Sequence, residues 1–179
     1  MKYYISDLHL GHANALIFDN RPFATLEEME NKIVENWNKT VTDNDDVYIL
    51  GDVVWKNVYW ETIKKLKGRK HLIKGNHDRL SAEAKECFVS INDYEEIKDG
   101  DTSVILCHFP IASWNKMTHG SVHLYGHVHN SEEIRVLDGP KTMFEKRFNL
   151  PYLAFNVGCM LDYMNYTPRT LKEIMESNL

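Results

Sequence analysis

Several features that define other protein classes are scarce in this chain of 179 residues. It has three cysteines and no Cys-x-x-Cys pair, so neither a disulfide framework nor a structural zinc finger is expected, and a reducing compartment fits. No apolar run approaches the roughly 18 residues that a membrane-spanning helix needs. The first residues also lack the apolar segment of a signal peptide. We therefore expect a cytoplasmic protein with no membrane partner.

Basic residues are also fewer than acidic residues. Lys and Arg number 21 against 26 Asp and Glu, which gives a net charge of −5. General nucleic-acid binders are more often basic, so nucleic acid is not the expected partner. The one basic cluster, residues 64–70, is interpreted as a solvated helix end and the turn that follows it. The sequence does not indicate an oligomeric state.

What remains is an ordinary globular composition, with 43% hydrophobic and 26% charged residues. The length predicts a single domain over residues 1–179. The first part of the chain alternates strand and helix patterns, which is typical of a layered α/β fold. Strands are predicted over 2–6, 47–50 and 71–73, and helices over 25–37, 59–66 and 81–86. Thr25 and Glu28 form a capping-box pattern at the start of the first of these helices.

The second half is richer in strand patterns. Strands over 94–98 and 102–107 flank Asp99-Gly100-Asp101, which is a hairpin signal. Further strands are predicted over 121–125, 132–137 and 152–157, and Thr167-Pro168 predicts the start of a last helix. Residues 139–150 show no clear period. Because this segment follows the last polar cluster of the chain, we expect it to form one wall of a pocket.

Five separate segments end in side chains that can bind a metal ion, and each follows a strand-like run. These side chains are Asp7 with His9, Asp52, Asn76 with His77, His108, and His127 with His129. Functional groups of an α/β sheet gather at the carboxyl ends of its strands. Residues two apart on a strand point to the same side, so each paired block is expected to present two ligands together.

The set contains imidazole, carboxylate and one amide, but no thiolate. This mixture suits Mn, Fe or Zn. Seven ligands are too many for one tetrahedral ion and suit two ions that share a carboxylate. Asp52 is the natural bridge, because a carboxylate has two oxygens. Two ions roughly 3.5–4 Å apart clamp the attacking and leaving oxygens of an in-line phosphoryl displacement.

The order of these blocks resembles that of the calcineurin-like metallophosphoesterase superfamily, in particular its small single-domain members of bacterial and phage type. The matching blocks are Asp7-x-His9, Gly51-Asp52, Gly75-Asn76-His77-Asp78, His108 and Gly126-His127-x-His129. They span residues 7–129, most of the chain. The resemblance implies an α/β fold that is a four-layer α/β/β/α sandwich, with two facing mixed β-sheets and a dimetal site at one edge.

The resemblance also implies roles for these residues. One ion would be held by Asp7, His9, Asp52 and His129, and the other by Asp52, Asn76, His108 and His127. His77 would be the catalytic residue, contacting the phosphate and stabilising or protonating the leaving oxygen. A hydroxide that bridges the two ions would attack phosphorus in line, without a covalent enzyme intermediate. Manganese is the ion expected first, with iron, zinc and nickel as alternatives.

One departure concerns the orientation of the catalytic histidine. In many relatives an acidic residue a few positions after the Gly-Asp block orients it, but residues 53–56 here contain no acid. Asp78 and Asp46 are the candidates to replace that acid.

Other residues have simpler interpretations. His12 and Asn14 follow the first metal block, and either lining a substrate pocket or capping the next segment would explain them. His71 and His119 are expected at the surface or in turns, and His123 in a structural role. Cys107 and Cys159 are expected to be small buried hydrophobes.

The prediction is a metal-dependent phosphoric ester hydrolase that acts on a phosphodiester, a small nucleotide or a related phosphate ester. No segment looks long enough to form a capping domain, so an open pocket is expected, and an open pocket tolerates the second substituent of a diester. The alternatives are a phosphomonoesterase, a nuclease with the same site, and a non-catalytic scaffold of the same fold. The scaffold is disfavoured because the chain keeps His77 and every ligand.

Overall fold

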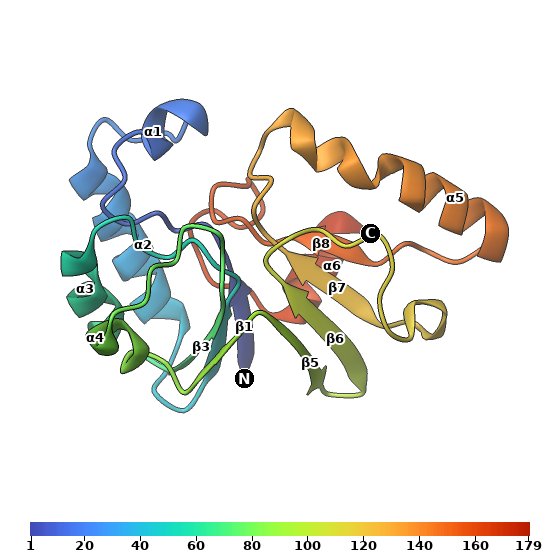
Figure 1. Cartoon of the computed structure of the whole chain (residues 1–179), viewed down its shortest axis with the longest axis horizontal. Coiled ribbons are helices and arrows are strands. Elements are labelled where there is room, and N and C mark those ends of the chain that lie inside the picture. The colour runs from blue at the N-terminus through green and yellow to red at the C-terminus, as the bar shows by residue number, and fades with distance from the viewer.

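Two four-stranded sheets stand side by side in the centre of the computed structural model, which describes residues 1–179 (Figure 1). The first sheet, in the order β1-β2-β3-β4, is parallel throughout. In the second sheet, β5 and β6 pair antiparallel, while β6, β7 and β8 run parallel. The strands are β1 Lys2–Ile5, β2 Asp46–Ile49, β3 Arg69–Ile73, β4 Ser90–Asn92, β5 Tyr94–Asp99, β6 Thr102–Cys107, β7 Val122–Tyr125 and β8 Ala154–Asn156.

Helices form the two outer layers. They are α1 Ala15–Phe18, α2 Leu26–Thr40, α3 Trp60–Lys65, α4 Ala82–Lys85, α5 Asp138–Phe148 and α6 Leu171–Asn178. Figure 1 shows α2, α3 and α4 on the outer side of the first sheet and α5 beyond the second. Helix α6 packs against β1 and β8. The predicted four-layer α/β/β/α sandwich is confirmed, but only the second of its sheets is mixed, because every strand pair of the first is parallel. No helix combines the length and the apolar character needed to cross a membrane.

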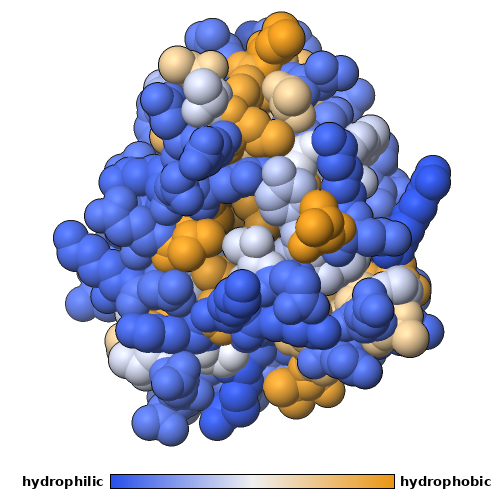
Figure 2. All heavy atoms as spheres, turned by 90° about the vertical axis from the view of Figure 1, so that its left-hand side faces the viewer, coloured by the Kyte–Doolittle hydropathy of each residue, from blue (hydrophilic) through white to orange (hydrophobic).

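Helix α2 shows how local sequence sets an element. The Thr25 side chain accepts the Glu28 N–H, and the Glu28 side chain accepts the Thr25 N–H, so the predicted capping box is present. Met29, Ile33 and Trp37 then fall on one buried stripe. With this stripe of α2 buried, the face that α2 to α4 present to solvent is mostly hydrophilic, and its apolar residues form separate patches (Figure 2).

The strands of the second sheet divide the core in two. Val104 and Leu106 of β6 belong to the main core of 35 buried residues. The intervening residue, Ile105, points to the opposite face and joins a cluster of seven that includes Phe144 of α5. This alternation follows from the period of two along a strand, and it accounts for the helix outside the second sheet.

Two sequence predictions in the second half are wrong. Residues 132–137, predicted as a strand, form a 3-10 helix that leads directly into α5, and the Ser131 side chain accepts the Glu133 N–H at its start. Only Leu137 of this helix is buried, so the segment lacks the row of alternate buried side chains that a strand in a sheet presents. The last helix starts at Leu171 with a capping box of Thr170 and Glu173, because Arg169 is still paired with Tyr4 of β1.

His123 has the structural role that was predicted. It lies fully buried in β7, where Nδ1 donates to the Ile105 carbonyl at 3.2 Å and Nε2 accepts the Ile111 N–H at 3.2 Å. Burial lowers the pKa of His123 to about 4. The folded protein therefore holds this ring neutral at pH values where the unfolded chain protonates it.

This difference predicts a loss of stability in acid. Between about pH 6.5 and pH 4 the unfolded state binds a proton that folded His123 does not, so the free energy of unfolding falls as pH falls, by roughly 3 kcal/mol from this residue. Urea unfolding at pH 7 and pH 4.5 should show a smaller pH effect in His123→Gln than in the wild type. The exposed-site variant His119→Gln should keep the wild-type pH effect. An unchanged pH effect in His123→Gln would contradict this assignment.

Candidate metal centre

The candidate ligands gather where strands of both sheets end. Asp7, Asp52 and Asn76 follow the parallel strands β1, β2 and β3, and His108 and His127 follow the parallel strands β6 and β7. The carboxyl ends of parallel strands meet at one edge of a sheet. Because the backbone N–H of Ser6 donates to the Val157 carbonyl just beyond β8, the two edges are joined and their ligands face each other.

The backbone of the ligands is not that of an extended strand. Asp7, His9, Asp52, His127 and His129 all have positive φ, between 48° and 70°. Side chains other than glycine pay roughly 1–3 kcal/mol in such sparsely populated conformations, which persist where the surrounding structure fixes them. The ligands therefore converge because tight turns follow the strands. The alternation of side chains along a strand, which was expected to bring the ligands together, does not do so. Such strain is concentrated at functional sites.

Gly126 allows the backbone that follows β7 to approach the end of β1 closely. A Cβ on Gly126 would lie 2.5 Å from Asp7 Oδ2 and 2.5 Å from Ser6 Oγ. The absence of that atom allows the Gly-His-x-His turn to pack directly on the end of β1. The His127 N–H then reaches both Asp7 oxygens at 3.2 Å.

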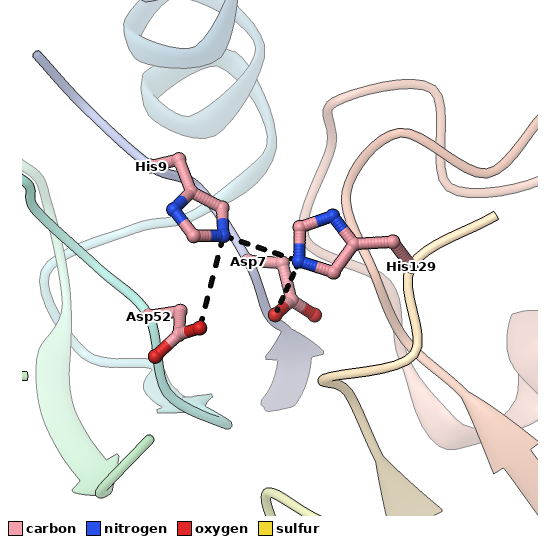
Figure 3. Close-up of side chains that lie close together, drawn as sticks. All are labelled: Asp7, His9, Asp52 and His129. Carbon is pink, nitrogen blue, oxygen red and sulfur yellow. Dashed lines mark hydrogen bonds and ion pairs between the residues drawn. The ribbon is translucent and has the colours of Figure 1, made fainter. Parts of the chain in front are cut away.

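Four buried or half-buried side chains form the first ligand set, which Figure 3 shows converging from both sheets. His9 Nε2 lies 3.2 Å from His129 Nε2 and 3.8 Å from Asp52 Oδ2. Asp7 Oδ1 lies 3.6 Å from His129 Nε2. One ligand atom from each of the four residues lies within 4.8 Å of the others, a spacing that a single ion can fill.

The second ligand set lies beside the first. Asn76 Oδ1 is 2.9 Å from His127 Nδ1 and 3.1 Å from His108 Nε2. His108 Nδ1 donates to the Leu50 carbonyl at 2.6 Å, so Nε2 is left with its lone pair toward the site. His127 and His129 thus point into different sets, as the resemblance implied, whereas the expectation that strand alternation places both rings on one face is wrong.

Asp52 links the two sets through a single oxygen. Its Oδ2 lies 3.8 Å from His9 Nε2 and 3.7 Å from His108 Nε2. Its Oδ1 accepts the His77 N–H at 2.9 Å, which fixes the carboxylate in this orientation. One oxygen is therefore anchored to the backbone, while the other lies between the two groups of ligands.

The charge of the site fits a cation. Asp7 and Asp52 are 0% and 2% exposed, and their only ionic partners are histidines. Burial and the neighbouring His129 lower the pKa of His9 to about 2, and burial lowers the pKa of His127, so these rings are neutral ligands at pH 7. Burial raises the pKa of Asp7, and the neighbouring His129 and His108 offset this only in part. For His129, burial lowers the pKa, but the hydrogen bond to Asp19 and the charge of Asp7 raise it by more. Buried carboxylates facing imidazoles are a donor set that suits a divalent ion.

Two residues that fix the orientation of His129, Asp19 and Arg21, were not predicted from the sequence. Asp19 Oδ1 accepts the His129 Nδ1–H at 2.7 Å, which directs Nε2 of that ring toward Asp7. Arg21 pairs with Asp19 Oδ2 at 2.7 Å and donates to the Asp7 and Leu8 carbonyls at 2.9 and 3.1 Å. Such partners fix the tautomer and orientation of a metal-binding histidine. The sequence does contain the charged pair Asp19-x-Arg21 after the first metal block, but no sequence pattern shows that both side chains are buried.

Asp19→Asn tests this support. The amide oxygen would turn to Arg21, which needs an acceptor, and the amide NH₂ would then donate to His129 Nδ1. The ring would place its proton on Nε2, toward the cluster, and metal affinity should fall about 10–100-fold. Mn²⁺ titration followed by calorimetry measures this loss. The exposed-site variant Asp162→Asn is the matched control, and equal affinities in the two variants would exclude the role of Asp19.

His77 lies exposed at the mouth of the centre. Its ring centroid is 5.1 Å from that of Trp55. Neither acid proposed to orient it does so. The Asp78 carboxylate is taken up by the N–H groups of Asp52, Val53 and Gly75 at 2.8–2.9 Å, which ties the second and third ligand loops together. Asp46 lies at the opposite end of β2, where it pairs with Arg69.

The remaining expectations are partly met. His12 stacks on Trp55, with centroids 3.8 Å apart and ring planes 4° apart. Asn14 occupies the N-cap position of α1 without a side-chain cap bond. His119 is exposed as expected, but His71 is wrong as a turn residue because it lies half-buried in β3, bonded to Ser90 Oγ at 2.8 Å.

Two further expectations concern the cysteines Cys107 and Cys159 and the segment 139–150. Cys159 is buried, and its Sγ donates to the Asp7 carbonyl at 3.2 Å, whereas Cys107 is half-buried. Residues 139–150 do not line the cavity beside His77. Most of them form α5, which with residues 112–119 lines a separate cavity of about 730 Å³.

Comparison with known proteins gives a consistent result. A family model described as the calcineurin-like phosphoesterase superfamily domain matches residues 2–171. An uncharacterized protein of Methanocaldococcus jannaschii is 35% identical over 131 residues, covering 71% of this chain and 68% of its own. The gene 66 protein of Mycobacterium phage D29 is 27% identical over 158 residues, covering 72% of this chain and 78% of its own. A crystal structure of a protein of unknown function from Aquifex aeolicus aligns over 99% of this chain and 98% of its own, with a TM-score of 0.74 and 27% identity.

Proposed function

Because the chain belongs to the calcineurin-like phosphoesterase superfamily, we propose that it is a dimetal phosphodiesterase acting on a small nucleotide or a related phosphate ester. The observation that carries the proposal is the position of Asp52 Oδ2, at 3.8 and 3.7 Å from histidine nitrogens of the two ligand sets. A carboxylate oxygen shared in this way suits a pair of ions better than a single one.

We assign one ion to Asp7, His9, Asp52 and His129, and the other to Asp52, Asn76, His108 and His127. The all-N/O donor set suits manganese first, with iron, zinc and nickel as alternatives. When bound, two such ions polarise the phosphoryl group and activate water as a nucleophile near neutral pH.

The chain itself supplies geometry and a proton donor. Asp19 and the Leu50 carbonyl hold the rings of His129 and His108, so that both present nitrogen lone pairs without rearrangement. His77 has its backbone N–H bonded to Asp52 Oδ1, and we assign its ring to contact with the phosphate. From there it donates a hydrogen bond to the phosphoryl group and a proton to the leaving oxygen.

The open mouth of the centre favours a diester. Asn76 and His77 are exposed, and a cavity of about 200 Å³ lies next to His77. A second substituent on phosphorus therefore has room. The free cysteines are compatible with action in the cytoplasm.

The test compares two chromogenic esters with metal-stripped protein after Mn²⁺ is added back. We expect Mn²⁺-dependent turnover, with kcat/KM for bis-p-nitrophenyl phosphate above that for p-nitrophenyl phosphate. Preference for the monoester would retain the metal chemistry and replace the diester assignment. The absence of turnover with either ester, in protein that binds two ions, would contradict the proposed hydrolase activity on simple esters.

A further inference from the structure

The cavity beside His77 contains none of the proposed metal ligands. It is lined by Val54, Trp55, Asn57, His77 and Arg79 and has a volume of about 200 Å³. We call these five residues the leaving-group pocket. No acidic side chain lines it, so positive charge inside it is not neutralised by its own walls.

Arg79 is the charged residue of the leaving-group pocket. It is exposed and makes no hydrogen bond or ion pair with the rest of the chain. Of the other arginines, Arg21, Arg69, Arg135 and Arg169 pair with carboxylates, and Arg147 of the separate cavity near α5 does not. An unpaired guanidinium is available for an anion, and its fork matches the oxygens of a phosphate or carboxylate.

Trp55 is the aromatic residue of the pocket. It is 46% exposed, while Trp37, Trp60 and Trp114 are 0%, 2% and 8% exposed. His12 covers one face of its indole at 3.8 Å and nearly parallel, which holds the ring in place. A large aromatic ring that is held on one side and remains half-exposed is a stacking surface for a base or another planar ring.

His77 connects this pocket to the chemistry. It lines the pocket, its ring centroid is 5.1 Å from that of Trp55, and its N–H is fixed to Asp52. If His77 gives its proton to the leaving oxygen, the leaving group must lie on this side of phosphorus.

We propose that the leaving-group pocket selects a leaving group that carries both an aromatic ring and an anionic group, the chemistry of a nucleotide. The ring stacks on Trp55 and the anion pairs with Arg79. This proposal rests on the function proposed above and narrows its substrate class.

Binding to metal-free protein tests the pocket without turnover. Trp55 is the accessible tryptophan, so acrylamide quenching of tryptophan fluorescence reports on it directly. Adenosine 5′-monophosphate should protect the EDTA-treated protein from quenching, and adenosine should bind about tenfold more weakly, the effect of one charged hydrogen bond of roughly 1.5 kcal/mol. Inorganic phosphate alone should give no protection.

Variants assign each contact. In Arg79→Gln the affinity for the monophosphate should drop to that of adenosine. In Trp55→Phe the quenching signal should largely disappear, which verifies that the assay reports on Trp55. Arg147→Gln, which alters an arginine of the separate cavity near α5, is the matched control and should behave as wild type. Equal protection by adenosine and its monophosphate, unchanged affinity in Arg79→Gln, or no protection by any ligand would each overturn the proposal. Because this assay needs no metal, its failure is distinguishable from a failure of the ester hydrolysis test.

Discussion

Replacing Asp52 by asparagine is expected to lower Mn²⁺-dependent turnover of bis-p-nitrophenyl phosphate by about 10³-fold or more, the equivalent of several kcal/mol of lost charge stabilisation. The reason lies in the hydrogen bond from the His77 N–H to Asp52 Oδ1. That N–H keeps the carbonyl oxygen of the new amide, so the NH₂ group takes the place of Oδ2 between the two ligand sets. A donor then faces the position where both ions need an acceptor.

The control for this substitution has the same chemistry at a remote position. Asp101 is exposed in the turn between β5 and β6, so Asp101→Asn should keep wild-type turnover and metal content. Metal content of Asp52→Asn, measured after gel filtration, should fall together with activity. An Asp52→Asn protein that retains two ions and more than a tenth of the wild-type turnover would show that Asp52 is not the shared ligand.

For diesters whose leaving group needs a proton, His77→Gln is expected to lower kcat by about 10²–10³-fold, within the range for loss of a general acid, while the protein still binds metal. The side chain of His77 lies exposed and outside both ligand sets, so its removal leaves the distances among the ligands unchanged. The exposed-site control is His119→Gln, which should be as active as wild type.

The leaving group separates proton donation from simple phosphate binding. Nitrophenolate departs without a proton, whereas an alkoxide needs one. Proton donation by His77 therefore predicts a larger loss for diesters with poor leaving groups than for nitrophenyl esters. The same loss with all leaving groups would assign His77 to charge stabilisation of the phosphoryl group alone.

Sequence reasoning succeeded for the candidate site where a local signal and a general rule coincide. Asp52, His108 and Asn76 each follow a short apolar run, and the carboxyl ends of parallel strands lie together whatever the loops do. The strand alternation inferred for Asp7 with His9 and for His127 with His129 was wrong, because all four residues lie in left-handed turns after the strands. The division of His127 and His129 between the two ligand sets is the one that the resemblance implied.

The missed features depend on tertiary contacts that no local pattern encodes. Asp19 pairs with Arg21 and His129, and Arg21 donates to the Asp7 carbonyl, contacts that form only in the folded chain. The stack of His12 on Trp55 joins residues from two different loops. Helix α5 buries just one residue, Phe144, so its sequence shows no apolar stripe, and Gly139-Pro140 near its start is atypical of a helix.

Asp52 is proposed to join two ions through one carboxylate. Electron paramagnetic resonance of metal-stripped protein during titration with Mn²⁺ measures this directly. The six-line signal of free Mn²⁺ should stay low until two equivalents have been added, and the bound ions should give the multiline spectrum of a spin-coupled pair. Asp52→Asn should lose that coupling. Saturation at one equivalent, or two bound ions with uncoupled spectra in the wild type, would contradict this role of Asp52.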